Sequence, residues 1–243
     1  MNFEKYLAMP NVKIPLTVLK KLEDEHDITK TEFEDMNSIL TSPLLQEEIG
    51  YTKTKTGDLL VSVTCPMPNV TPEMINWWFW WHAQEPVRYQ LWYPHEHLSI
   101  SYDKKQTAYF KADKFTKFEP NTHYPVEKIG GIAFPLQISF MNPTDFGFDE
   151  KTMAENGVGT ILCANIGAFK GLIEHSKMCH IFFERDGGLF LVSRFWLGKT
   201  VKNKFIRKFM LIDKMALDMA KHCYVEYRNL AIKLPSLYEE FGK

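Results

Sequence analysis

His222 and Glu226 lie four residues apart in a segment near the end of the chain whose apolar residues recur at helical spacing. On a helix, positions four apart are neighbours, so this imidazole and this carboxylate can converge on one metal ion. Met215 and Met219 belong to the same stripe, which indicates that both polar side chains point inward. An uncompensated carboxylate is costly in an apolar interior, and a bound divalent ion would offset its charge. The alternative is a solvent-facing ion pair, the usual explanation of this spacing.

Two inward ligands need partners, and the candidates lie on segments outside this helix: His82, His95, His97, His123, Glu127, His175 and His180. In the run WYPHEHL, side chains alternate along an extended chain, so His95 and His97 share a face and one of them suffices. Glu127 precedes two glycines in PVEKIGG, where the backbone can approach another element closely. The simpler interpretation of each candidate is a structural or solvated side chain, and we assign His82 and His123 to it.

The middle of the chain is rich in predicted strands. Four stretches combine β-branched and aromatic residues between turn signals: Ile132 to Phe140, Gly159 to Ala168, Lys177 to Arg185 and Leu189 to Gly198. Asp186-Gly187-Gly188 joins the last two, and its glycines tolerate the positive φ of a tight hairpin turn, so these two strands should pair antiparallel. The segment from Arg88 to Tyr102 is also predicted as extended chain, after Pro86 ends a helix.

Helices are predicted on both sides of these strands. The acidic segment from Leu16 to about Leu45 is weakly helical, and Thr71-Pro72-Glu73 begins a short helix that runs through the tryptophan-rich segment to about His82. A long amphipathic helix is predicted from about Lys204 to Leu230, closed by Pro235. Antiparallel strands followed by one long helix favour an α+β fold in which a curved sheet wraps the helix and leaves a cavity for a small apolar molecule.

Composition narrows the classes of partner. In 243 residues, 29 Lys+Arg balance 30 Asp+Glu, and no basic cluster accompanies a nucleic-acid motif, so no nucleic-acid partner is expected. The four cysteines are far apart and form no CxxC pair, which favours small core thiols in a reducing compartment over disulfides or a zinc ribbon. The sequence shows neither a secretory leader nor a run of about 20 apolar residues, so we expect a cytoplasmic protein without a membrane partner.

Four runs follow one another between Ile75 and Phe241: INWWFWWHAQEPVRYQLWYPHEH, VEKIGG, SRFWLG and HCYVEYRNLAIKLPSLYEEF. Together and in this order they resemble the 2,4-diacetylphloroglucinol hydrolase family. The resemblance implies a zinc enzyme with a helix-grip (Bet v 1-like) domain, a helical N-terminal part and a Zn²⁺ site of two histidines and two glutamates. On this basis we expect residues 1–70 to form a helical N-terminal extension and residues 71–243 to form the metal-binding catalytic domain.

Matched motif by motif, the resemblance implies that the metal ligands are His97, Glu127, His222 and Glu226, with His95 as a spare. It implies catalytic roles for Tyr89, His180 and Glu127. The Tyr89 hydroxyl is expected to face a phenolic oxygen of the substrate, and His180, with an ordinary pKa near neutrality, is expected to deliver a proton to the departing carbon.

Two positions depart from the family pattern. Ile100 stands where a polar residue is expected three positions after the metal histidine, and Phe195 stands where a tyrosine is expected. These departures leave the identity of the substrate open.

The reaction that the resemblance implies is hydrolysis of a carbon–carbon bond between an acyl group and a phenolic ring or β-diketone carbon. A metal ion could polarise the acyl carbonyl or lower the pKa of water near it. The alternatives are a non-catalytic helix-grip carrier of a hydrophobic small molecule and another metal-dependent reaction in the same cavity, such as cyclisation or decarboxylation. The expected partner is a small aromatic or β-diketone substrate, and a homodimer is left open.

Overall fold

The computed structural model describes residues 3–24, 26–168, 173–203, 207 and 212–242, and a seven-stranded antiparallel sheet lies at its centre. The strand order is β1-β2-β10-β9-β8-β7-β4. The bounds of these strands are β1 Gly50–Lys53, β2 Leu59–Pro68, β4 Thr122–His123, β7 Gln137–Met141, β8 Val158–Ala168, β9 Ile173–Arg185 and β10 Gly188–Leu197. β9 and β10 pair antiparallel around Asp186 and Gly187, where Gly187 has a φ of 80°, so the predicted hairpin is confirmed.

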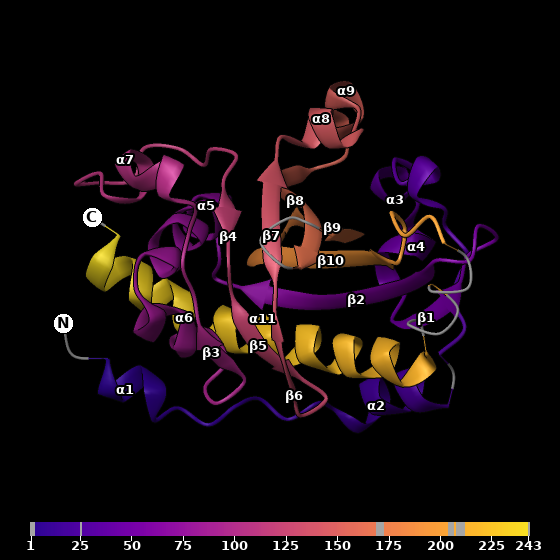
Figure 1. Cartoon of the computed structure of the whole chain (residues 1–243), viewed down its shortest axis with the longest axis horizontal. Helices are drawn as coiled ribbons and strands as arrows, with labels where there is room; N and C mark the ends of the chain where they lie inside the picture. Colours follow the sequence, from indigo (N-terminus) through magenta and orange to yellow (C-terminus); the bar gives the residue numbers. More distant parts are fainter. Residues whose placement is uncertain (1–2, 25, 169–172, 204–206, 208–211, 243) are drawn as a thin grey trace.

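A 29-residue helix, α11 (Asp213–Phe241), runs along one face of this sheet beneath β2 (Figure 1). Its central turns are buried on nearly every side, because the sheet covers one side and other helices and strands pack around the rest. This arrangement is the helix-grip fold predicted from the sequence, an α+β domain whose curved sheet holds a long C-terminal helix. The other face of the sheet is covered by short helices that pack on Leu60, Ile181 and Trp196.

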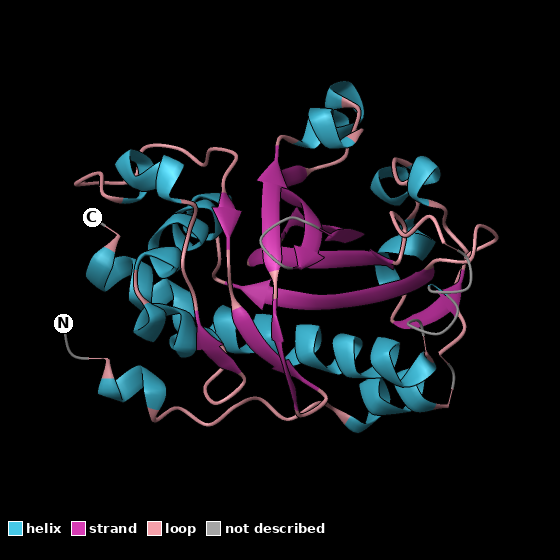
Figure 2. Cartoon of the chain, viewed as in Figure 1, coloured by secondary structure: helices cyan, strands magenta, loops and turns pink. Residues whose placement is uncertain are grey.

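A smaller three-stranded sheet, of order β3-β5-β6, crosses in front of α11 (Figure 2). Its strands are β3 His97–Ser99, β5 Val126–Ile129 and β6 Ile132–Pro135. β6 and β7 follow each other with only Leu136 between them, so the strand predicted from Ile132 to Phe140 exists but is divided between two sheets. The consequence is that β5 and β6 extend the main sheet over the helix and close one side of the interior.

Short helices surround these elements. They are α1 Glu4–Leu7, α2 Leu16–Glu23, α3 Ser38–Thr41, α4 Pro43–Glu47, α5 Pro72–Trp81, α6 Pro86–Trp92, α7 Thr107–Phe110, α8 Pro143–Phe146 and α9 Glu150–Glu155, with 3₁₀ turns η1 Phe33–Asp35, η2 His82–Gln84 and η3 Lys104–Gln106. The predicted helix of the tryptophan-rich segment is confirmed as α5, and the Thr71 side chain caps it by accepting a hydrogen bond from the Met74 N–H. None of the helices in the described part of the chain is long and apolar enough to cross a membrane.

The segment from Arg88 to Tyr102 contains the strand β3, but the extended chain predicted for its first part is wrong. Pro86 occupies the first turn of α6 rather than ending a helix, and α6 continues to Trp92. Proline is favoured in the first turn because the N–H that it lacks has no partner there in any case. The aromatic residues that suggested a strand instead pack in the core, where tertiary contacts outweigh their modest helix propensity.

Helix α11 also differs from its predicted bounds. It passes through Pro235 and ends at Phe241, because Leu234 and Leu237 are fully buried beyond Leu230 and this packing offsets the hydrogen bond that proline removes. The predicted start near Lys204 lies outside the described residues. Ile212 is the N-cap of the helix and is 53% exposed, so the apolar spacing that favoured a helix before Asp213 does not bury this residue.

The predicted boundary at residue 70 is wrong, because β1 and β2 lie before it and belong to the central sheet. β2 pairs with β10 from Leu59 to Pro68, so it cannot be separated from the central sheet. The run LLVSVT at its start carries the β-branched signal of a strand, which the helical interpretation of the N-terminal region overlooked. The earlier segment is helical as expected, and Asn229 of α11 fastens it by accepting a hydrogen bond from the Val12 N–H at 2.8 Å.

Replacing Leu230 with Ala should lower the free energy of unfolding by about 2–5 kcal/mol, because its fully buried side chain would leave a cavity between helix and sheet. Ile232 on the same helix is 56% exposed, so Ile232→Ala should change the free energy by less than about 0.5 kcal/mol. Urea unfolding of both variants measures the difference. Equal losses would contradict the orientation of the helix described above.

Candidate metal centre and active site

His97 and Glu127 face each other across two paired strands. In the antiparallel pairing of β3 with β5, their Cα atoms are direct partners, so both side chains leave the same face of the small sheet. His95, the spare histidine, lies in the turn before β3 with a φ of 72° and points to solvent. It therefore does not share a strand face with His97 as the sequence had suggested.

A tight turn after β5 holds Glu127 close to helix α11. Gly130 and Gly131 connect β5 to β6 with φ values of 61° and 84°, a conformation that favours glycine. A Cβ atom at Gly130 would lie 2.2 Å from a carboxylate oxygen of Asp218 on α11. The glycine pair therefore allows the strand to approach the helix, as the sequence predicted for the VEKIGG element.

His222 and Glu226 are buried on α11 and face the pair on β3 and β5. The predicted inward phase of this helical pair is confirmed. The indole N–H of Trp92, at the end of α6, donates a 2.8 Å hydrogen bond to the backbone carbonyl of Glu226. Lys233 donates to the carbonyl of Leu91 at 2.7 Å, so α6 and α11 are joined at two places beside the site.

The four side chains converge. His97 Nε2 lies 3.3 Å from His222 Nε2 and 3.4 Å from Glu226 Oε2. His222 Nε2 lies 3.9 Å from Glu226 Oε2 and 3.8 Å from Glu127 Oε2. Ligand atoms about 2.0–2.2 Å from a tetrahedral ion are about 3.3–3.6 Å apart, so these spacings suit one ion among the four groups. Three of them, His97, His222 and Glu226, each offer one ligand atom, and these three atoms lie within 4.8 Å of one another.

The charges of the site are unbalanced without a cation. Burial raises the pKa of Glu127 to about 7, and burial together with the charge of Glu127 raises the pKa of Glu226 well above its usual range. Burial also lowers the pKa of His222 to about 4 and that of His97 well below its usual range. Among the described residues, no lysine or arginine pairs with either carboxylate. Neutral imidazoles and carboxylates in need of a cation are the donor set of a divalent metal site.

Neighbouring groups orient these side chains. His97 Nδ1 lies 3.4 Å from the Tyr89 carbonyl, and His222 hydrogen-bonds the backbone of Lys128. Such contacts fix the tautomer of a metal-binding imidazole and leave the other nitrogen free for the ion. The Tyr89 ring stacks on His97 with a centroid distance of 4.1 Å, and its hydroxyl donates a hydrogen bond to Glu127 Oε1. Burial raises the pKa of Tyr89 well above its usual range, so the hydroxyl keeps its proton at neutral pH.

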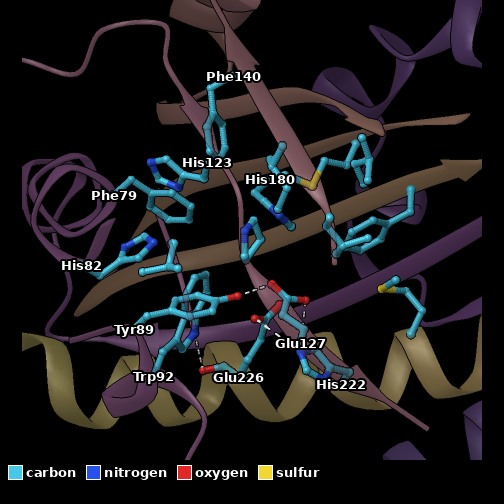
Figure 3. Close-up of a pocket in the computed structure, with 18 residues that line it drawn as sticks. Phe79, His82, Tyr89, Trp92, His123, Glu127, Phe140, His180, His222 and Glu226 are labelled. Atoms are coloured by element: carbon cyan, nitrogen blue, oxygen red, sulfur yellow. Dashed lines mark hydrogen bonds and ion pairs between the residues drawn. The ribbon is translucent and has the colours of Figure 1, made fainter. Parts of the chain in front are cut away.

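A pocket opens beside the four groups (Figure 3). Glu127, His222 and Glu226 form one end of it, and most of the wall is apolar: Phe79, Trp92, Ile100, Pro125, Leu136, Ile138, Phe140, Ile166, Met178, Phe195 and Met219. Ile100 and Phe195, the two departures noted in the sequence, both line this pocket. The tryptophan that reaches it is Trp92 rather than a member of the tryptophan-rich helix α5.

His180 projects into the pocket from β9, while its Nδ1 lies 2.8 Å from the Ser193 hydroxyl of β10. Burial lowers the pKa of His180 to about 3, so its imidazole is neutral at pH 7. The near-neutral pKa expected from the sequence is therefore wrong, because the expectation used the value of a solvated imidazole. A proton that His180 delivers must first be received from another group.

Two lining residues were missed. His82 and His123 are buried in the pocket wall, although the sequence analysis assigned them to structural or solvated positions. No local pattern separates them from other isolated histidines, because their burial depends on contacts with distant segments. His175, another early candidate, lies on β9 outside the pocket and contacts the Ser176 hydroxyl. The four cysteines are buried and free, as expected.

Comparisons with known proteins identify a family for this chain. The family model of the DAPG hydrolase PhiG domain matches residues 30–239. A 2,4-diacetylphloroglucinol hydrolase of a Pseudomonas species is 28% identical over 268 residues, which cover 99% of this chain and 88% of that protein. The phloretin hydrolase of Eubacterium ramulus is 32% identical over 203 residues, 79% of this chain and 72% of that protein. The crystal structure of Ara h 8.0201 is similar with a TM-score of 0.42 and 12% identity, over 73% of this chain and 99% of that one.

Adding Zn²⁺ to metal-depleted protein should raise its melting temperature, because the ion binds only where the folded chain brings the four groups together. At a free concentration about 100 times the dissociation constant, the expected rise is about 5–10 °C. The variant Glu226→Gln should lose most of this rise, whereas Glu239→Gln, an exposed position on the same helix, should keep it. Differential scanning calorimetry provides the measurement, and an equal rise in both variants would place the bound ion elsewhere.

Proposed function

Because the chain belongs to the DAPG hydrolase PhiG domain family, we propose that it hydrolyses the carbon–carbon bond between an acyl group and a phenolic ring or β-diketone carbon. Family membership confirms the enzyme class predicted from the sequence, a hydrolase. Both relatives described above are named for hydrolysis of a phenolic ketone, which supports this class of substrate. The observation that carries the proposal is the convergence of two imidazoles and two carboxylates at one end of an apolar pocket.

His97, Glu127, His222 and Glu226 would hold the metal ion in this proposal. Mixed nitrogen and oxygen donors at these separations favour Zn²⁺ over a hard cation that takes only oxygen. When bound, the ion supplies Lewis-acid polarisation of the acyl carbonyl and lowers the pKa of water. The pocket beside it has apolar walls suited to an aromatic ring, so a phenolic ketone could place its carbonyl at the charged end and its ring between the apolar side chains.

The reaction requires charge stabilisation on the departing fragment. Water adds its oxygen to the acyl carbon, the bond to the ring carbon breaks, and the electron pair is delocalised onto a ring oxygen until the ring carbon takes up a proton. The products are a carboxylic acid and the deacylated phenol. A hydrogen-bond donor near the ring oxygen lowers the barrier, because the contact strengthens as negative charge develops there.

Tyr89 is the donor that we assign to this oxygen. Its ring is held by stacking on His97 and on His82, with centroid distances of 4.1 and 5.5 Å, and its protonated hydroxyl lies at the edge of the pocket beside Glu127. From this position the hydroxyl can donate either to the Glu127 carboxylate, as it does here, or to a substrate oxygen. The same side chain thus supports a ligand and contacts the substrate.

His180 is the group that we assign to proton transfer. As a neutral imidazole it can accept a proton from the attacking water and then release it to the ring carbon, which balances the reaction without an external acid. Its hydrogen bond to Ser193 and the edge of the Phe195 ring fix its orientation in the pocket. The proposed role is the proton delivery expected from the sequence, but the His180 imidazole is neutral rather than charged before the reaction begins.

Tyr89→Phe and His180→Ala should each lower the turnover of an acylated phenol by about 100-fold or more and leave the bound metal in place. Steady-state kinetics and elemental analysis of the same samples measure the two quantities. Tyr51→Phe and His175→Ala remove the same groups outside the pocket and should keep both turnover and metal.

Two outcomes would contradict these assignments. Loss of metal in either variant would show that the main role of that residue is to keep the metal bound rather than to act on the substrate. Binding of acylated phenols and β-diketones by the metal-loaded protein without any product would contradict the hydrolase and favour the carrier.

A further inference from the structure

The pocket has a second polar end that the proposed reaction does not use. His82 and His123 lie beside Phe79, away from Glu127, His222 and Glu226 (Figure 3). The two imidazole rings meet edge to face with a centroid distance of 5.3 Å. His82 comes from the turn that follows α5, and His123 comes from β4, so segments far apart in the sequence place two histidines at one end of an otherwise apolar wall.

His82 presents a hydrogen-bond acceptor at this end. Its Nδ1 lies 2.7 Å from the carbonyl of Trp78, which can only accept, so Nδ1 carries the proton. Burial lowers the pKa of His82 to about 3, so the imidazole is neutral, and the lone pair on its Nε2 meets no hydrogen-bond donor among the described residues. Stacking on Tyr89 and packing against Phe79 and Trp92 hold the ring in place.

His123 is buried without a described hydrogen-bond partner. Neither its Nε2 nor its Nδ1 forms a hydrogen bond with a described residue. The ring packs against Phe110 and Phe140, where an apolar side chain of similar size would avoid the cost of an unpaired imidazole. A neutral imidazole has one N–H donor and one acceptor, so His123 can supply the donor that His82 lacks.

One acceptor and one donor at the same end of a pocket fit a hydroxyl group, which can donate to the first and accept from the second. We propose that His82 and His123 bind a hydroxyl group of the substrate's aromatic ring, the one opposite the acyl group. This inference rests on the proposed function, because the acyl carbonyl must lie at the end formed by Glu127, His222 and Glu226.

Other ligands fit this end less well. A carboxylate or phenolate would have no positive charge near it, since burial also keeps the pKa of His123 well below its usual range. A second metal ion would have two imidazoles and no carboxylate among the described residues at this end of the wall. A neutral hydroxyl satisfies both imidazoles without introducing a charge into an apolar environment.

A stack of side-chain rings that joins the two ends also favours a substrate ring bound across the pocket. The rings of His97, Tyr89 and His82 form a continuous stack, with Tyr89 between the metal-binding imidazole and the second polar end. A substrate that lies along this stack meets polar groups at both ends and apolar side chains at its faces. The acyl group and the hydroxyl opposite it are the two substituents that such a ring directs to opposite ends.

The test compares 2′,4′,6′-trihydroxyacetophenone with 2′,6′-dihydroxyacetophenone, which lacks the hydroxyl opposite the acyl group. The ratio of their kcat/KM values is measured in the wild-type enzyme and in His123→Phe. Because the intrinsic reactivity of each ketone is the same with both enzymes, the change in the ratio isolates the contact. We expect the preference for the trihydroxy compound to fall about 10-fold or more in His123→Phe and to be largely kept in His123→Asn, which retains a donor and an acceptor.

The melting temperature of the variants distinguishes a substrate-binding role of His123 from a structural role. His123→Phe loses no hydrogen bond to a described residue, so its melting temperature should stay the same or rise. His175→Phe, the same change outside the pocket, should keep the wild-type preference. An unchanged ratio in His123→Phe overturns the inference, as does an equal loss for both ketones with a lower melting temperature. His123→Leu carries the same expectations should the Phe variant fail to fold.

Failure of the proposed function gives a different result. If the wild-type enzyme hydrolyses neither ketone, calorimetric titration of both still measures whether the extra hydroxyl strengthens binding and whether His123→Phe removes that gain. A gain of about 10-fold in the wild type that is lost in His123→Phe supports the hydroxyl site without turnover. Equal affinities of the wild type for both compounds overturn it.

Discussion

Two carboxylates, Glu127 and Glu226, are buried beside two neutral imidazoles without a described lysine or arginine to balance them. Removing such charges from water is costly unless a cation or a proton compensates them. Without a bound cation, this cost raises the pKa values of both carboxyl groups. A divalent ion would turn the unfavourable cluster into a favourable one, so the need for a cation at this point accounts for how the surrounding elements are arranged.

The fold meets this requirement with regular elements rather than with mobile loops. One turn of α11 carries two of the groups, and one cross-strand pair of β3 and β5 carries the other two. The tight turn at Gly130 lets the strand approach the helix, and the hydrogen bond from Trp92 fixes the helix at Glu226. Groups placed on packed helices and strands keep their separations, which a metal site needs for a defined geometry. The two ends of the apolar pocket differ chemically, because Glu127, His222 and Glu226 form one end and two histidines, His82 and His123, form the other.

The helix pair could be predicted from the sequence because its ligand spacing and its apolar phase lie within one element. His97 and Glu127 depended on the family resemblance, since strand pairing between distant segments leaves no local spacing. Prediction from the sequence failed where tertiary packing outweighed local signals, as at α6, where aromatic residues form a helix, and at Pro235, which α11 passes through. It also placed β2 in a helical extension despite its β-branched run. His82 and His123 gave no local signal, because their surroundings form only when α5, α6 and β4 come together.

The central claim is that one divalent ion lies among His97, Glu127, His222 and Glu226. Crystals grown with Zn²⁺ and measured at the zinc absorption edge would locate the ion by its anomalous scattering, independently of any assumed chemistry. The account predicts one strong peak about 2.0–2.2 Å from Nε2 of both histidines and from an oxygen of each glutamate. A peak at another position, with none among these four side chains, would contradict it.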